Sequence, residues 1–464
     1  MAFKDILKNL PEVKGPIEKK LSFNVKLKWT LIILLAFFVL ANISLYGLEN
    51  NALARFQYLA VILGTDFGSI ISLGIGPIVM ASIILQLLVG SKILNIDTKT
   101  EEGKKYFQGL QKVLVFFFIL FEAAIYVLMN GLQAAPGYTG IVIFQLVLGG
   151  LAIVFMDEVV QKWGFGQGVS LFIVAGVGWR IFTEMFQFIG QQGGNCLLNF
   201  SGSNFISCPG QIFSLIQTII NQDIIGATSA AAAILVTVII FLFVVYAQSL
   251  KIEVPLSFDR LRGYGIKWPL AFFYASVIPV ILVAALAANL QLFAGLIEGW
   301  LGHATWLGSF SGGQAVSGFA FWISHTNIVG LAIKGGLRSI YLIQGLTHIL
   351  FYAAFSCLFA YFWMKTSGMD ASSQAKNIIS SGLQIPGFRK DERILESILD
   401  RYIVPLTVMG GAAIGLLAAF ADGLGAMVSG TSILLAVMII YQYYTSISQQ
   451  HAVDMHPAMR KFMG

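Results

Sequence analysis

GTDFGSIISLGIGPIVMASIILQLLVG, residues 64–90, is the stretch that decides the fold. It carries no charge between Asp66 and Lys92, and it is long enough to cross a bilayer, which takes about 20 apolar residues. Gly74, Gly76 and Pro77 disfavour a continuous helix. Two interpretations stay open: a half-helix, a break at 74–77 and a regular helix to about Leu88, or one Pro-kinked membrane helix. Irregular backbone at membrane depth must be buried in protein or line a water-filled cavity, so the first interpretation places a cavity here.

The composition indicates a membrane protein. Of the 464 residues, 57% are hydrophobic and 11% are charged, and the mean hydropathy is +0.79. We expect an all-α polytopic membrane protein with ten transmembrane helices. The first four expected spans are 29–48, the broken 64–90, 113 to about 133, and one from the turn at 136–137 to before Asp157. A fifth is expected between Lys162 and Arg180, and five more within 224–250, 268–297, 339–364, 402–421 and 423–453. The stretch 316–333 is apolar but rich in Gly, Ser, His and Asn, which predicts a re-entrant or surface segment.

The basic residues orient these spans. All but four of the 29 Lys and Arg residues fall on one face of a ten-span chain, and the exceptions are Arg55, Arg180, Lys334 and Arg338. The positive-inside rule makes that face cytoplasmic, so residues 1–26 and 449–464 are expected in the cytoplasm. The net charge of +6 then belongs to loops beside the membrane, which argues against a free nucleic-acid-binding protein. The N-terminus shows no cleavable signal peptide, and its charged segment is either a surface helix or an anchoring flank.

Three cysteines are present. Cys196 and Cys208 lie in the predicted external loop 191–223, and the outside of a cell is oxidising, so a disulfide between them is expected. The same loop holds a glycosylation sequon at Asn199. Cys357 lies inside the eighth span, where a small apolar role is expected.

No catalytic constellation is found in the sequence. The five histidines lack metal-ligand spacing, and no phosphate-binding loop occurs. Glu122 is the one acid predicted to lie well inside a span, apart from Asp66 near a span end, and it is either functional or a protonated structural acid. We therefore expect no enzyme activity and no cofactor. A secondary transporter with inverted repeats stays the alternative to a channel.

Several sequence blocks resemble one known family. GIGPIVMASIILQLLVG is similar to the second-span signature of the SecY family, the channel-forming subunits of the protein-secretion translocon. The likeness continues through GQGVSLFI, VPLSFDRLRGYG, VIPVILVAALAANLQLF, GFRKDERILESILDRYIVPLTVMGG, GTSILLAV and HPAMRK, in the family's order and spacing. The tail and the loops resemble archaeal members.

The resemblance implies a fold and a pore. It implies two pseudo-symmetric five-helix halves, 27–190 and 224–448, with a plug at about 59–73 formed by the broken second helix. A narrow aliphatic ring seals such a pore because it binds no ion and dewets when empty. The matching ring positions are Ile75, Val79, Val169, Ile173, Ile278, Ile281 and Leu435. The plug residues are Leu63, Gly64, Asp66, Gly68, Ile70 and Ile71, and Asp66 is expected to stay in the outer aqueous funnel.

The resemblance also implies a seam and several partners. Hydrophobic segments leave sideways into lipid between spans two and three and spans seven and eight. The matching polar seam residues are Ser82, Gln86, Glu122 and Asn289, although Met80 and Val277 stand where the family carries Thr and Asn. The cytoplasmic loops 251–267 and 365–401 are expected to bind a ribosome. Their residues for this role are Arg260, Arg262, Arg389, Lys390 and Arg393. Further implied partners are a SecE-like subunit, a small third subunit of the SecG or beta type, signal sequences, nascent chains and membrane lipid. The expected location is the plasma membrane.

Overall fold

The computed structural model describes residues 10–17, 21–96, 100–189, 194–197, 207–258, 265–274, 277–380, 383–384 and 391–455. Within these ranges the chain is mainly helical. Nine helices there are long and apolar enough to cross a membrane. They are α2 (Phe23–Ala41), α5 (Glu101–Leu128), α6 (Thr139–Trp163), α7 (Gly168–Phe186), α9 (Ile224–Gln248), α10 (Ile278–Leu301), α13 (Ser339–Thr366), α15 (Glu392–Gly423) and α16 (Gly430–Met455).

A tenth, shorter apolar helix accounts for the deciding stretch. It is α4 (Gly76–Gly90), which begins with Pro77 in its first turn. Proline fits there because the first N–H groups of a helix have no partner within the helix. The predicted break at 74–77 is therefore confirmed, and the alternative of one continuous kinked helix is wrong.

The part before the break is less helical than expected. The predicted half-helix over 59–73 is wrong in extent, because the 3₁₀ helix η1 (Ala52–Phe56) and α3 (Gln57–Ile62) end at Ile62. Residues 63–75 follow as tight turns. Gly64, Gly68 and Gly74 have φ angles of +54°, +99° and +55°, a region that favours glycine over other residues. The glycines that weaken a helix here are the residues that permit the turns.

The other spans differ from the prediction mainly at their ends. The first helix begins at Phe23 and ends at Ala41, because the chain then turns into a strand that pairs with residues after the third span. The fourth helix runs through Asp157 to Trp163, so the predicted end before Asp157 is wrong. The ninth begins at Glu392, well before the apolar run. Charged first and last turns extend beyond the hydrocarbon core, which hydropathy alone does not detect.

Short strands and helices connect the spans. The stretch 316–333 contains two helices that are too short to cross a membrane, which agrees with a re-entrant or surface segment. Three small sheets form, with orders β1-β2, β4-β3-β7 and β5-β6. The short elements are β1 (Leu48–Asn51), β2 (Leu132–Ala134), α8 (Gln211–Ile220), β3 (Lys251–Phe258), β4 (Gly265–Ala271), β5 (Ser309–Ser311), β6 (Gln314–Ser317), α11 (Phe319–Ile323), α12 (Ile328–Ile333), α14 (Ala371–Ser380) and β7 (Leu383–Gln384).

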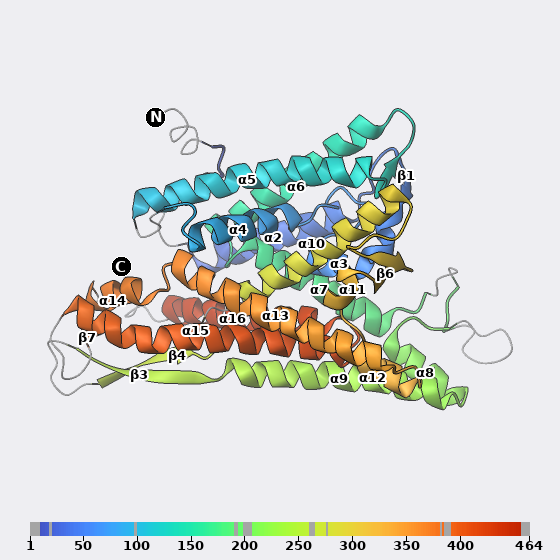
Figure 1. Ribbon diagram of the computed structural model, residues 1–464. Helices are drawn as coiled ribbons and strands as arrows, with labels where there is room; N and C mark the ends of the chain where they lie inside the picture. The colour runs from blue at the N-terminus through green and yellow to red at the C-terminus, as the bar shows by residue number, and fades with distance from the viewer. Residues whose placement is uncertain are drawn as a thin grey trace.

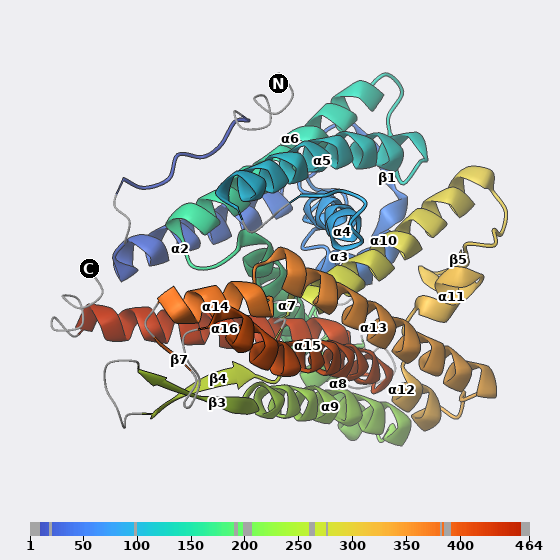
Figure 2. The ribbon, with the colours of Figure 1, turned by 60° about the vertical axis from the view of Figure 1, so that its left-hand side comes forward.

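The bundle has two ends and two sides. The start of α2, the end of α16, α14 and the β3–β4 hairpin lie at one end, which we call the sheet end (Figure 1). The β5–β6 hairpin, α8 and α12 lie at the opposite end, which we call the hairpin end. Figure 2 shows α2, α5 and α6 on one side, α9, α13, α15 and α16 on the other, and α4, α7 and α10 between them. One buried apolar core runs through both sides.

Residues 10–16 run without regular structure along the sheet-end tips of α5 and α6. The backbone N–H of Val13 donates to Glu158, and Lys162 donates to Glu12, each at 2.9 Å. The indole of Trp163 donates to the carbonyl of Lys14. This part of the N-terminal segment therefore binds its own chain instead of forming a free surface helix.

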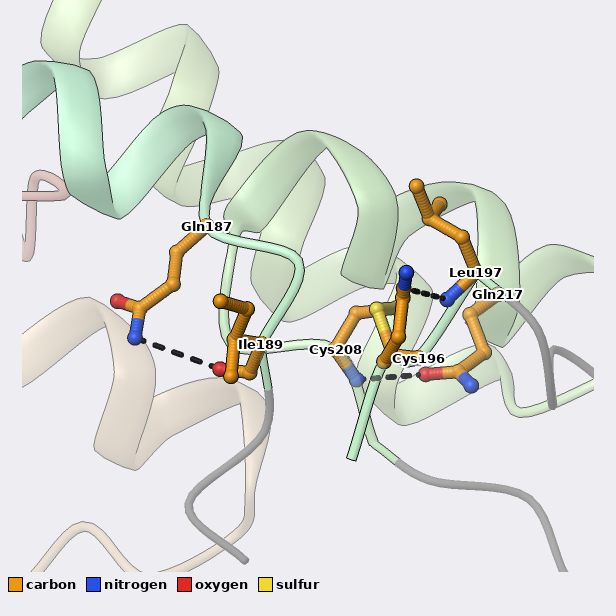
Figure 3. Close-up of a disulfide and its surroundings, with 7 residues drawn as sticks. Gln187, Ile189, Cys196, Leu197, Cys208 and Gln217 are labelled. Atoms are coloured by element: carbon orange, nitrogen blue, oxygen red, sulfur yellow. Dashed lines mark hydrogen bonds between the residues drawn. A yellow bond between two sulfur atoms is a disulfide. The ribbon is translucent and has the colours of Figure 1, made fainter. Parts of the chain in front are cut away.

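The loop between α7 and α8 contains a disulfide between Cys196 and Cys208, whose Cα atoms are 5.3 Å apart. The backbone N–H of Cys208 donates to the side chain of Gln217 in α8 at 2.9 Å (Figure 3). The bond therefore ties the loop to the helix that follows it. Cys357 is a free, half-buried thiol in α13. The sequon at Asn199 lies outside the described residues.

Candidate functional site

The seven predicted ring residues lie in one apolar cluster where the two sides of the bundle meet. Ile75 and Val79 come from the start of α4, Val169 and Ile173 from α7, Ile278 and Ile281 from α10, and Leu435 from α16. Five of them are at most 5% exposed, and Val169 and Ile278 are partly buried against the same cluster. Side chains from α4, α7, α10 and α16 thus belong to one buried apolar cluster.

A polar cavity lies on the sheet-end side of this cluster. It has a volume of about 370 Å³, and Val79, Val169, Ile278 and Ile281 line it. The other lining side chains include Ser82, Gln86, Gln108, Gln111, Gln161, Gln167 and Lys104. Amide side chains favour water in this space, whereas the aliphatic side chains offer an ion no ligand. The cavity therefore combines several amide side chains with aliphatic residues of the predicted ring.

The predicted plug residues pack against predicted ring residues at the start of α4 and in α7. Gly64 packs close to Ile75 and to Phe172 of α7, and the backbone N–H of Ile75 donates to Leu63 at 2.9 Å. Leu63 and Ile71 are at most 1% exposed. Asp66 is exposed, as expected for a residue in an outer funnel.

Backbone contacts fix the plug to the N-terminal half. The N–H of Leu45 donates to Gly68, and the N–H of Ile70 donates to Ile43, both at 2.9 Å. Gly149 of α6 lies directly against the carbonyl oxygen of Ile70, and a Cβ atom at Gly149 would be 1.9 Å from that oxygen. The plug is therefore bound to the segment after α2 and to α6.

Of the predicted seam residues, Gln86, Glu122 and Asn289 are buried and Ser82 is half-buried. Four of their side-chain oxygens have no hydrogen-bond partner: Oε1 of Gln86, Oε1 and Oε2 of Glu122, and Oδ1 of Asn289. The amide of Asn289 donates to Ala285 of its own helix, and Glu122 packs against Gly76 at the start of α4. Ser82 accepts a hydrogen bond from Gln111 at 2.8 Å within the same half. No hydrogen bond joins Gln86, Glu122 and Asn289 to one another in the described part of the chain.

Sequence reasoning missed two buried acids. Asp157 and Asp422 were expected at span ends, yet they lie inside α6 and α15 and are 7% and 5% exposed. Asp157 accepts a hydrogen bond at 2.9 Å from the backbone N–H of Val169, so it fixes the start of α7 and one ring residue. No local pattern links two residues that are twelve positions apart, and only the tertiary fold brings them together.

The residues proposed for partner binding are only partly described. Arg393 is exposed in the first turn of α15. Arg260, Arg262, Arg389 and Lys390 lie outside the described residues. The two loops that carry these residues meet in one sheet, because β3 pairs with β7 through Ser257–Gln384 and Phe258–Leu383.

The comparisons with known proteins agree with this geometry. The family model described as SecY matches residues 69–444. A protein translocase subunit SecY from Methanothermobacter thermautotrophicus is 41% identical, over 100% of this chain and 98% of that protein. A solved structure titled "The structure of a protein conducting channel" is 36% identical, covers 98% of both chains and has a TM-score of 0.81. A Sec61 structure from the canine ribosome-channel complex is 34% identical, with 98% coverage of both chains and a TM-score of 0.78. This chain belongs to the SecY family.

Proposed function

We propose that this chain forms a protein-conducting channel, through which unfolded polypeptides cross the membrane and from which hydrophobic segments leave sideways into lipid. The observation that supports the proposal is the cluster of aliphatic side chains from α4, α7, α10 and α16, with an amide-lined cavity beside it and the turns of residues 63–75 packed against it. Separation of the halves widens such a ring, and its return to contact seals it against ions. The names of the relatives, a translocase subunit and a protein-conducting channel, support the same function.

The ring also argues against a secondary transporter. Transporters of this size usually place polar or charged substrate ligands near the bilayer midplane, where this chain places aliphatic side chains. The described residues contain no group of three or more His, Cys, Asp or Glu side chains that could hold a metal ion. The names of the relatives, a translocase subunit and a protein-conducting channel, support our proposal of a channel without enzyme chemistry of its own.

We assign the sheet end to the cytoplasm and the hairpin end to the outside of the plasma membrane. The positive-inside rule supports this orientation, since the basic loops gather at the sheet end. The disulfide at the opposite end fits an oxidising exterior. Both termini are then cytoplasmic.

The proposed partners are a SecE-like subunit, a small third subunit and a ribosome. The canine relative was solved as part of a ribosome-channel complex, which supports the ribosome as a partner. Loops 251–267 and 365–401 share a sheet, so their basic residues would contact ribosomal RNA phosphates as one surface. The seam would receive signal sequences, nascent chains and lipid.

A stalled secretory chain tests the channel. A photo-cross-linker at Ile75 or Ile278 should react with a chain arrested in transit, because both side chains lie in the ring. The same probe at Leu235, which is 61% exposed on α9, should not react. A probe that reacts at Leu235 but at neither ring position in the assembled complex would favour the transporter.

The seam residues yield a second prediction. Replacing both Glu122 and Asn289 by Leu should favour the closed channel, because their buried oxygens have no hydrogen bond there while water can reach them in an open seam. Membrane hydrogen bonds average about 0.6 kcal/mol, so a few-fold loss in translocation of weakly hydrophobic signal sequences is expected. Thr228→Leu, at an exposed site on α9, is the control. If the double variant accepted weakly hydrophobic signals better than wild type, the two polar side chains would be stabilising the closed channel, which would contradict this prediction.

A further inference from the structure

At the hairpin end, residues 55–58 of the N-terminal half contact the C-terminal half. Arg55 donates to the carbonyl of Gly295 in α10 at 3.1 Å, and the Tyr58 hydroxyl donates to Gln291 at 2.8 Å. The Tyr58 ring also meets the His325 ring edge-on, with centroids 5.7 Å apart. We call this set of contacts the clasp. Its members are Arg55, Phe56 and Tyr58 from the plug-bearing segment, and Gln291, Gly295, Phe310, Gly313 and His325 from the C-terminal half.

A buried polar cluster supports the C-terminal side of the clasp. Asp422, in the last turn of α15, accepts hydrogen bonds from the backbone N–H and the hydroxyl of Thr431 in α16. His348 of α13 places Nε2 3.3 Å from Asp422 Oδ2 and Nδ1 2.7 Å from the carbonyl oxygen of Ile323. Asp422, His348 and Thr431 are each at most 5% exposed. The cluster thus joins α13, α15 and α16 to the segment that carries His325.

The geometry requires a proton between Asp422 and His348. Nδ1 of His348 faces a carbonyl oxygen, which only accepts, so Nδ1 must carry hydrogen. Nε2 faces a carboxylate oxygen, so the contact needs one more hydrogen, on Nε2 or on the carboxyl group. Without that proton, a lone pair and a negative charge would face each other away from water, which is costly.

We propose that Asp422 and His348 are positioning residues that hold the clasp closed by sharing this proton. The bond from His348 to Ile323 fixes Phe319–Ile323, and Gln344 adds bonds to Phe321 and Ser324, so His325 is held against Tyr58. Loss of the proton weakens that anchor and frees Tyr58 and Arg55 from α10. The inference rests on the proposed channel function, because opening of the seam is its readout.

Other titratable groups around the pair respond differently to pH. His325, between α11 and α12, and Tyr352 of α13 both lie near Asp422. Tyr58 of α3 lies near Tyr352. Burial lowers the pKa of His325 from its ordinary value, so His325 is already neutral at neutral pH and does not change at alkaline pH. Phenols ordinarily titrate near pH 10. Neither His325 nor an ordinary phenol therefore changes its charge between about pH 7 and about pH 9.

The test uses the assembled complex in lipid vesicles, with Asp422→Asn and His348→Gln as variants and His303→Gln as the control at an exposed site. Wild type should translocate a weakly hydrophobic signal better as external pH rises. The two variants should start about threefold to tenfold higher at pH 7 and show no further rise, because the anchor is already lost. His303→Gln should follow the wild-type profile.

Further variants guard against misfolding. Tyr58→Phe removes one clasp bond without leaving a charge unpaired, and it should raise weak-signal transport in the same direction while keeping the pH response. Asp422→Glu should restore part of that response. A wild-type profile that is flat with pH, or an Asp422→Asn profile that still rises like wild type, would overturn the proposal. Failure of wild type to transport any signal would instead count against the proposed channel.

Discussion

A resting channel with Ile278→Asn conducts ions where wild type does not. Ile278 belongs to the predicted ring and also lines the amide-rich cavity beside it. An unpaired amide in an apolar constriction costs about 1–3 kcal/mol, and water entering the ring removes that cost. The population of the wet state should therefore rise about tenfold to a hundredfold. Single-channel or vesicle-flux conductance of the reconstituted complex is the measurement.

The matched control for the ring is Ile278→Leu. It keeps an aliphatic side chain of the same volume at the same position, so it should preserve the seal. Val79→Asn, on the facing helix α4, should leak as Ile278→Asn does. Conductance of both Asn variants at the wild-type level would show that the seal lies elsewhere.

A second large effect is expected at the contact between α6 and the predicted plug. Gly149→Ala places a Cβ atom 1.9 Å from the carbonyl oxygen of Ile70, so the plug backbone must move away from α6. Overpacking of this kind costs about 1–3 kcal/mol. The amide hydrogen of Ile70, which is bonded to Ile43, should exchange with solvent about tenfold to a hundredfold faster.

Gly140 provides a control on the same helix. A Cβ atom there meets nothing within 4 Å, so Gly140→Ala makes the same chemical change in α6 without touching the plug. Its exchange rate at Ile70 should equal that of wild type. Equal rates in both variants would mean that α6 does not seat the plug.

Much of the fold could be predicted because hydropathy and helix breakers act locally. Uncharged runs predicted the spans, and Gly74 with Pro77 predicted the break before α4. The ring positions were assigned through family resemblance, and residues from four separate helices do lie in one cluster. Helix ends were the weakest part, since charged turns such as those at the start of α15 continue past the apolar run.

The remainder depends on contacts between distant parts of the chain. His348 and Asp422 are 74 positions apart, and neither has a local partner that would predict a pair. The turns of residues 63–75 depend on packing against α6 and α7, so the sequence suggested a helix where the chain folds back instead. The lack of hydrogen bonds at the buried oxygens of Gln86, Glu122 and Asn289 also depends on side-chain placement that no spacing encodes.

The contacts of the proposed plug bear on whether the seam or the plug opens first when a signal inserts. The backbone bonds of the plug run to Leu45 and Ile43, and its closest packing is on Gly149, all within the N-terminal half. Parting of the two halves along α4 and α10 breaks none of these bonds. We therefore expect a signal to enter the proposed seam while the proposed plug still blocks the pore, so that the membrane stays tight to ions until the polypeptide displaces the plug.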